Sequence, residues 1–310
     1  MMLVLVIKTI LAFNESFIKT NIDSLNSLLR MTRTVSNQKI SFDVRLVGWI
    51  DPKQKQAFSE EYSQTVLLHS NDCDIGTKCN IECDVLSENH GKLYAINKIV
   101  SKLNVDNYDK IIYADHDIVF DDSSVEYLKR HLCDTVFDRK IEGRTLKFIS
   151  FRQRQDERHN PIIYTKTITL NNKSHNEPDA CACTVSHNAT FYNYSDDNVH
   201  VATGCFITDS YGIKIVSQLS IKTENIEQNV KQNVYGDEDV LIGERLNQLS
   251  LVHVVLRDYY VVHPFDIDVS YSVWKRNMIF MTQAKRLIEN NTKINDRVNI
   301  VTQLRIVLEK

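Results

Sequence analysis

Glycine and proline are scarce in this 310-residue chain, which contains 8 Gly and 4 Pro. Long disordered linkers are rich in such residues, so the chain is not expected to contain one. An excess of one charge is also lacking, because 37 Lys and Arg stand against 40 Asp and Glu and give a formal net charge of -3. A nucleic-acid-binding protein would show a basic excess, and the composition gives that class no global support.

Long apolar runs are absent as well. No stretch approaches the roughly 18 uninterrupted apolar residues of a membrane-spanning helix, so no integral membrane association is expected. The apolar start, MMLVLVIKTILAF, is interrupted by Lys8 and has neither a basic leader nor a small-residue cleavage site. A buried first strand is therefore preferred over a signal peptide. We accordingly expect a cytoplasmic location, where the seven Cys would stay reduced.

The cysteines lack the spacing of a structural zinc site. Cys73, Cys79 and Cys83 lie near one another in the sequence, as do Cys181 and Cys183. None of them forms the Cys-x-x-Cys pair that such sites commonly use. A zinc centre is therefore the weaker of the metal hypotheses considered below.

Apolar, β-rich runs alternate with segments of helical period, which is typical of a mainly parallel sheet flanked by helices. The predicted strands are 3–11, 42–50, 65–70, 110–120, 145–151, 200–209 and 251–265. The predicted helices are 16–31, 52–62, 88–104, 123–132, 210–219 and 237–249, and helical spacing returns from residue 272 onward. We expect one α/β domain over residues 1–270 and a C-terminal helical tail over residues 271–310.

The segment 152–200 has a different character, because it is polar, patchy and rich in His and Asn. Long irregular segments inside a compact domain usually serve as lids or binding loops, so we expect an acceptor or lid loop here. Arg152, Arg154 and Arg158 would suit a phosphate-bearing partner. The competing interpretation is a solvated basic loop.

Two carboxylates interrupt the apolar run DKIIYADHDIVFDD at residues 109–122. An unpaired carboxylate in a dry interior is very costly, so Asp115 and Asp117 are expected where the strand leaves the sheet. Ligands of open α/β sheets bind at such strand ends. Strand alternation would place both side chains on one side, where hard oxygen donors suit Mg²⁺ or Mn²⁺. The alternative is a polar turn in which Asp117 caps a neighbour.

The segment YDKIIYADHDIVFDDSSVEYL resembles the nucleotide-sugar glycosyltransferases of the GT-A fold, with a family-8-like Asp-x-Asp motif at the end of an apolar strand. The resemblance extends more weakly over residues 1–265, through HGKLYAINK, TGCF, GDEDVL and a late VVH. It implies a Rossmann-like mixed, mostly parallel sheet flanked by helices. It also implies metal-dependent transfer of a sugar from a nucleoside-diphosphate donor, with a UDP-sugar preferred, to an acceptor hydroxyl.

The resemblance also implies roles for individual residues. Asp115 and Asp117 would hold Mn²⁺ or Mg²⁺ at the donor diphosphate, and His263 would complete the metal shell. His263 has a plainer alternative as a hydrogen-bonded histidine at a strand end. Asp239 would be the general base on the acceptor, or a positioning group if the enzyme retains configuration, with Glu238 as its competitor. Acids at a helix start also stabilise the helix dipole, which would explain them without catalysis.

Donor contacts are implied at four further positions. Lys92 would neutralise donor phosphate, although a solvated lysine is the simpler alternative. Gly204 would let the backbone approach the donor or acceptor. Phe13, after the first strand, and Asp51, after the second, occupy the loops expected to bind the nucleoside.

Some features depart from the family pattern. The segment HPFDIDVSYSVWK offers no Gly after His263, and the helix ENHGKLYAIN also resembles family-2-like enzymes, which invert. Stereochemistry therefore stays open. A sugar-nucleotide pyrophosphorylase-like nucleotidyltransferase would share the fold class, but its Gly-rich loop is missing from KTILAFNESF. A non-catalytic sugar-nucleotide-binding module is the other alternative.

The expected partner is the nucleotide-sugar donor. The acceptor stays open among a glycan, a lipid-linked glycan, a protein and a modified nucleic acid. A homodimer contact through the tail at 271–310 is one option for that segment.

Overall fold

The computed structural model describes residues 1–36, 39–71, 79–87, 91–135, 137–141, 143–155, 158–159, 166–169, 182–185, 204–219, 242–243, 245–246 and 248–263. The chain divides into two compact units, one of residues 1–234 and 238–265 and the other of residues 235–237 and 266–310. Every described residue belongs to the first unit, so the predicted tail at 271–310 lies outside the described residues.

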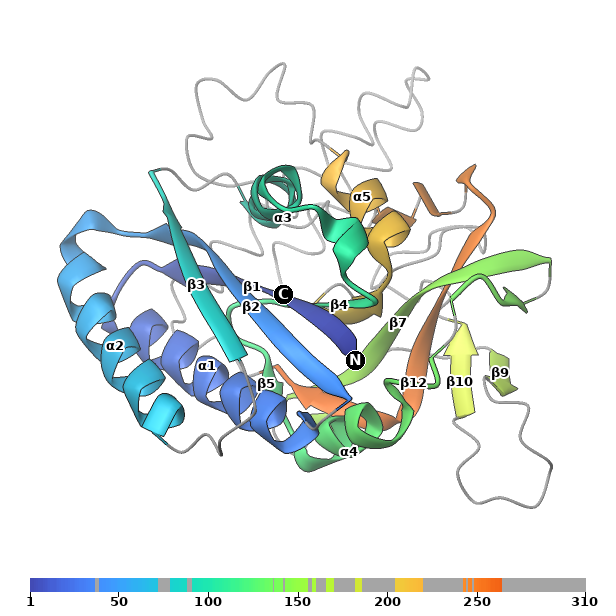
Figure 1. Cartoon of the computed structure of the whole chain (residues 1–310), viewed down its shortest axis with the longest axis horizontal. Coiled ribbons are helices and arrows are strands. Elements are labelled where there is room, and N and C mark those ends of the chain that lie inside the picture. The colour runs from blue at the N-terminus through green and yellow to red at the C-terminus, as the bar shows by residue number, and fades with distance from the viewer. Residues whose placement is uncertain are drawn as a thin grey trace, which may run out of the picture. The chain divides into compact units, whose positions relative to one another are not determined.

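A 12-stranded mixed sheet forms the centre of this unit, in the order β3-β2-β1-β4-β11-β7-β12-β10-β9, with β5, β6 and β8 beside the main path (Figure 1). The strands are β1 (Met2–Ala12), β2 (Ile40–Ile50), β3 (Cys79–Leu86), β4 (Lys110–Ala114), β5 (Val119–Phe120), β6 (Lys140–Ile141), β7 (Arg144–Gln155), β8 (Arg158–His159), β9 (Lys166–Thr169), β10 (Ala182–Val185), β11 (Cys205–Thr208) and β12 (Leu251–Val262).

Parallel pairing dominates the part of the sheet that carries the predicted site. β1 runs parallel to β2 and to β4, β2 runs parallel to β3, and β7 runs parallel to β12. β1 is buried almost throughout, as expected for a strand covered on both faces. The predicted α/β class, with a mostly parallel central sheet flanked by helices, is confirmed.

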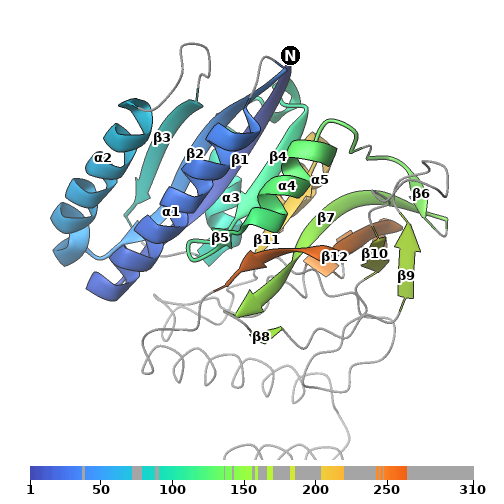
Figure 2. The same ribbon diagram turned by 90° about the horizontal axis from the view of Figure 1, so that it is seen from below.

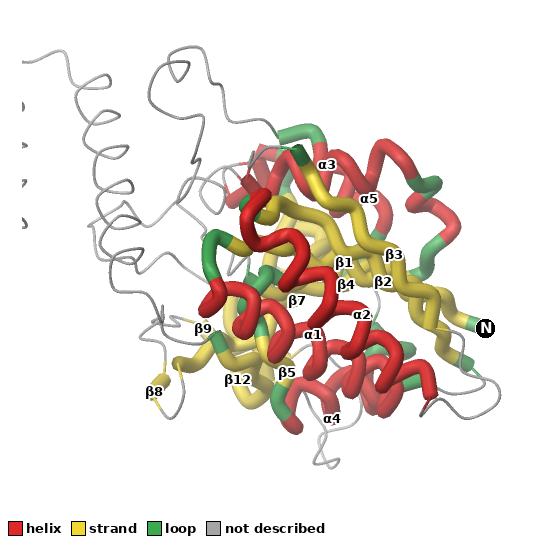
Figure 3. Tube along the Cα trace, turned by 90° about the vertical axis from the view of Figure 1, so that its left-hand side faces the viewer, coloured by secondary structure: helices red, strands yellow, loops and turns green. Residues whose placement is uncertain are grey.

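Helices cover both faces of the sheet. α1 (Glu15–Val35), α2 (Lys55–Asn71) and α4 (Asp122–His131) lie on one face, and α3 (Gly91–Lys102) and α5 (Ser210–Ser217) lie on the other (Figures 1 and 2). The short 3-10 helices are η1 (Pro52–Gln54) and η2 (Val105–Asn107). Figure 3 shows the two helical layers from the side. Among the helices that the structure describes, none combines the length and the apolar character needed to cross a bilayer.

Alternation along β1 assigns its side chains to the two layers. Leu5 and Ile7 belong to the buried cluster that includes Ile96 of α3 and Ile213 of α5. Neighbouring residues of a strand point to opposite faces, so Lys8 points toward α1. This assignment matters for the site, because it puts a lysine in the core below the end of β4.

The predicted strand at 65–70 is wrong. These residues form the last part of α2, and the sheet takes β3 from residues 79–86 instead. A short run of apolar and β-branched residues fits either structure, and here the helix continues through it. Leu67 and Leu68 are consequently 61% and 67% exposed on the helix surface.

Two other predicted segments are corrected in detail. The predicted strand at 110–120 is broken, because β4 ends at Ala114 and β5 begins at Val119. The segment 152–200, predicted as irregular, contributes the end of β7 together with β8, β9 and β10. Its other residues lie outside the described residues, so its role as an acceptor loop stays a prediction.

The correction at 65–70 can be tested with a pair of leucines. Leu68→Ala should change the free energy of unfolding by less than about 0.5 kcal/mol, because an exposed helical leucine has little to lose. Leu28→Ala, in the fully buried stripe of α1, should cost about 2–5 kcal/mol. Urea unfolding followed by circular dichroism measures both. A large loss for Leu68→Ala would show that 65–70 is a core segment.

Candidate functional site

The centre of the site is a turn at the carboxyl end of β4. The Asp115 N–H donates to the Gly204 carbonyl oxygen at 2.7 Å, and the Ile118 N–H donates back to the Asp115 carbonyl oxygen at 3.2 Å. Gly204 thus supports the turn through its backbone, immediately before β11, whose Cys205 pairs with Ala114. The turn lies at the sheet edge where ligands of α/β proteins commonly bind.

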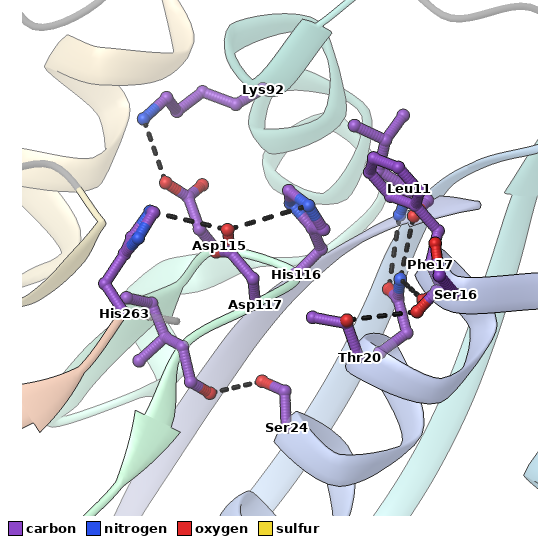
Figure 4. A network of polar contacts seen from close by, with 12 residues as sticks. Leu11, Ser16, Phe17, Thr20, Ser24, Lys92, Asp115, His116, Asp117 and His263 are labelled. Carbon is purple, nitrogen blue, oxygen red and sulfur yellow. Dashed lines mark hydrogen bonds and ion pairs between the residues drawn. The ribbon is translucent and has the colours of Figure 1, made fainter. Parts of the chain in front are cut away.

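Asp115 points toward the α3 side of the sheet. Its carboxylate accepts a hydrogen bond from the Tyr113 hydroxyl, and its Oδ2 lies 3.2 Å from Lys92 Nζ (Figure 4). Lys92 is the second residue of α3, after Gly91, whose φ of 78° is one that glycine adopts without strain. A lysine at a helix start is disfavoured by the helix dipole, so the ion pair with Asp115 offsets that cost.

Asp117 lies between two histidines. Its Oδ2 is 3.4 Å from His263 Nε2 and 3.8 Å from His116 Nε2 (Figure 4). His263 directly follows β12, and the pairing of Val262 with Val119 in β5 places it beside the turn. Asp117 is 7% exposed, so these contacts form in a largely desolvated setting.

Strand alternation does not apply to the two carboxylates, because both follow the end of β4 and lie in a turn. They also have different partners. Asp115 pairs with Lys92, whereas Asp117 lies against His263. Among the described residues, no group of three or more His, Cys, Asp or Glu is arranged to hold a metal ion. Two carboxylates and an imidazole are suitable donors for Mn²⁺, and in this structure Asp115 is paired with Lys92.

A second lysine lies below the turn. Lys8 Nζ donates to Ser24 Oγ at 2.6 Å, to the Asp115 carbonyl oxygen at 2.9 Å and to the His116 carbonyl oxygen at 3.2 Å. Burial lowers the pKa of Lys8 to about 8, although Asp117 and Asp115 act to raise it. With neutral histidines, the positive charges of Lys8 and Lys92 balance the negative charges of the two aspartates.

Polar residues in the buried stripe of α1 hold the neighbouring backbone. Asn21 bonds to both the N–H and the carbonyl of Leu11, near the end of β1. Ser24 donates to the Ile118 carbonyl oxygen, and Ser27 Oγ accepts from the Phe120 N–H at 3.1 Å. Our sequence analysis missed these residues and Lys8. Two features of the sequence could have indicated them. Asn21, Ser24 and Ser27 recur every three residues within the apolar stripe of a predicted helix, and Lys8 lies inside an apolar strand.

Aromatic rings connect the predicted nucleoside loops to the acidic turn. The ring of Phe13 lies 5.2 Å from that of Trp49 and 5.3 Å from that of Phe17, between centroids. Phe17 in turn stacks on His116 at 6.1 Å. Asp51 joins the same region, because its N–H donates to the Ala12 carbonyl oxygen at 2.8 Å. Its carboxylate caps η1 through the Lys53 N–H at 2.8 Å.

The structure therefore gathers Lys92, Asp115, Asp117, His263 and the backbone of Gly204 around one turn, with Phe13 and Asp51 farther along the same sheet edge. The predicted catalytic residues Asp239 and Glu238 lie outside the described residues. So do the side chains of Arg152, Arg154 and Arg158. Among the cysteines considered for zinc, Cys83 is a free thiol whose burial raises its pKa to about 11.

The chain has weak likenesses to several solved structures. No protein-family model and no curated protein matches the chain. The crystal structure of S. aureus TarS matches at 12% identity and a TM-score of 0.47, over 98% of this chain and 43% of that chain. TarS 1-349 in complex with UDP matches at 12% identity and 0.45, over 98% of this chain and 70% of that one.

A third solved structure is the mannosyltransferase PcManGT from Pyrobaculum calidifontis in complex with GDP-Man and Mn²⁺. It matches at 11% identity and a TM-score of 0.48, over 97% of this chain and 69% of that chain. Likenesses of this strength assign neither a fold family nor an activity.

Proposed function

We propose that this chain is a metal-dependent glycosyltransferase of the GT-A type that uses a nucleoside-diphosphate sugar, with a UDP-sugar preferred. The convergence of Lys92, Asp115, Asp117 and His263 carries the proposal. These residues come from three separate regions of the chain and meet at the carboxyl end of a parallel sheet. A partly desolvated group of two acids, a lysine and a histidine at a strand end is typical of functional sites, which favours this interpretation over a purely structural turn.

The aromatic residues fit the role of nucleoside binding. Phe13 and Trp49 are both partly exposed at the ends of β1 and β2, so each can offer a ring face to a base. Asp51, next to them, has a carboxylate that can accept hydrogen bonds from a ribose or a base. Phe17 contacts Phe13 on one side and His116 of the acidic turn on the other. A nucleotide whose base lies at Phe13 and Trp49 would therefore extend its diphosphate toward Asp115 and Asp117.

The charges of the site should make binding of the diphosphate and binding of the ion depend on each other. Asp115, Asp117 and His263 would hold Mn²⁺ or Mg²⁺, which as a Lewis acid stabilises the departing nucleoside diphosphate. Lys92 would then exchange its partner, leaving Asp115 for a phosphate oxygen at the start of α3, where the helix dipole also favours an anion. Since the two lysines already balance the two aspartates, a divalent ion should bind more tightly together with the negative diphosphate than alone.

The remaining sequence-based expectations complete the proposal. Asp239 acts on the acceptor hydroxyl as general base, or as a positioning group in a retaining enzyme, with Glu238 as the competing residue. The segment 152–200 contacts the acceptor, the protein is cytoplasmic, and the tail at 271–310 is available for pairing with a second copy. Each of these is an expectation from the sequence.

A donor screen tests the proposal directly. With Mn²⁺ and a panel of nucleotide sugars, beginning with UDP- and GDP-sugars, the chain should release free nucleoside diphosphate. Asp117→Asn should lower this release at least about 100-fold with little loss of folding, because the ion loses a charged ligand. Undiminished release by Asp117→Asn would refute the site. Nucleoside triphosphate and sugar 1-phosphate formed from the nucleotide sugar when pyrophosphate is added would instead identify a nucleotidyltransferase, and binding without release would identify a binding module.

Lys92→Met should have opposite effects on two affinities. Mn²⁺ alone should bind about three- to tenfold more tightly, because Asp115 loses a competing cation. UDP in the presence of Mn²⁺ should bind about tenfold more weakly, because a charge-assisted contact to phosphate is lost. Titration calorimetry measures both affinities.

Lys102→Met is the matched control for Lys92→Met, since Lys102 lies in the same helix but pairs with Asp84 at 2.7 Å. It should change neither affinity. If Lys92→Met leaves the affinity for Mn²⁺ alone unchanged, Lys92 does not compete with the ion, and weaker Mn²⁺ binding would contradict the exchange outright.

The two candidate catalytic acids can be separated by neutral substitutions. Asp239→Asn should lower acceptor-dependent turnover at least about 100-fold and leave donor affinity within about threefold of wild type. Glu238→Gln should lower turnover far less. Steady-state release of nucleoside diphosphate, with affinity from calorimetry, provides the comparison. The reverse ranking would move the catalytic role to Glu238.

A further inference from the structure

Lys8 is a charged residue in the middle of a core strand. It is 2% exposed, and its neighbours Val6 and Ile7 are fully buried. An ammonium group in such a place is costly unless hydrogen bonds and nearby negative charge compensate the lost hydration. The buried ammonium group of Lys8 therefore needs hydrogen-bond acceptors around it.

The acceptors of Lys8 are concentrated on the acidic turn. Its ammonium donates to the backbone carbonyls of Asp115 and His116 and to the hydroxyl of Ser24, which uses the donors that an ammonium has. Ser24 passes the connection on by donating to the Ile118 carbonyl oxygen. Lys8 and Ser24 together thus hold the carbonyls of residues 115, 116 and 118.

This arrangement fixes the direction in which the turn presents its side chains. Lys8 draws the carbonyls toward the α1 layer, while the Asp115 carboxylate meets Lys92 from the α3 layer. Asp117, one position beyond His116, lies against His263.

We propose that Lys8 is a positioning residue, which holds the backbone of the acidic turn from below so that Asp115 and Asp117 are set to receive a divalent cation. This inference rests on the proposed function and deepens it. Lys8 touches backbone carbonyls rather than the donor or the ion, so it acts through Asp115 and Asp117. The prediction is that its loss weakens cation binding beyond what the loss of a buried lysine does elsewhere.

A buried lysine at the opposite end of the sheet provides the control. Lys147 is 4% exposed and donates to Asp209, which caps α5. It lies next to Phe148, which pairs with Thr208, and Thr208 pairs with Ile111 near the start of β4 rather than at its end. Lys147 differs from Lys8 in forming ion pairs with Asp138 and Asp209. Lys147→Met therefore removes a buried lysine elsewhere in the sheet without touching the acidic turn.

The experiment compares the full-length wild type, Lys8→Met and Lys147→Met. Mn²⁺ alone is the probe, and its affinity is measured by calorimetry. Lys8→Met should weaken Mn²⁺ binding about 10- to 100-fold, as loss of an outer-shell partner does in metal sites, because the loosened turn outweighs the removal of a positive charge that contacts the carbonyls and not the carboxylates. Lys147→Met should stay within about threefold of wild type. Folded Lys8→Met with wild-type affinity would overturn the proposal, as would an equal loss in Lys147→Met.

Hydrogen exchange tests the role of Lys8 without depending on metal binding, so it distinguishes a failure of this inference from a failure of the proposed function. Backbone amides of residues 115–120 should exchange at least about tenfold faster in Lys8→Met but not in Lys147→Met, because only the former loosens the turn. If wild type binds no Mn²⁺, the proposed metal site fails, and the exchange data alone decide whether Lys8 holds the turn. Unchanged exchange in Lys8→Met would overturn that role.

Ser24→Ala is a milder variant in case Lys8→Met does not fold. It removes the hydroxyl that accepts from Lys8 and donates to Ile118, but it keeps the buried charge. It should weaken Mn²⁺ binding and speed exchange of residues 115–120 in the same direction, each by at least about threefold. No change in either quantity would overturn the proposal.

Discussion

Two carboxylates at the end of a buried strand demand compensation, and the structure supplies it from both faces of the sheet. Lys8, below the turn, binds its backbone carbonyls, and Lys92, above it, binds the Asp115 carboxylate. Without these two cations the acidic turn would carry unbalanced charge in a partly dry setting, which is strongly unfavourable. Lys92, His263 and the Gly204 backbone all contact residues of this turn.

The balance also defines what the site can accept. Asp115 and Asp117 already have counter-charges, so in the proposed function a divalent ion alone would compete with Lys92, whereas an ion that arrives with a diphosphate would add little net charge. A displaced Lys92 then has an anionic partner close at hand. Binding of cation and nucleotide should therefore be mutually dependent, which is a property of the whole charge arrangement rather than of any single residue.

Periodicity predicted most of the fold, because β1, β2, α1, α3 and β12 carry long, regular patterns of apolar residues. It failed where patterns were short. Residues 65–70 fit a strand and a helix equally well, and the continuation of α2 decided the matter. The strand predicted at 110–120 ends at Ala114, because the polar residues after it form a turn that other segments hold in place.

The sequence by itself determined the α/β class and singled out the candidate site residues, since an acid doublet after KIIY and a late histidine are visible without coordinates. Only the tertiary structure decided which groups meet. Lys8 and Asp115 are 107 positions apart, and the α1 serines reach a segment 93 or 94 positions away. Such pairs depend on how strands and helices pack. Local sequence patterns carry no information about such distant contacts, so Lys8 was identified from the sequence only as an interruption of an apolar run.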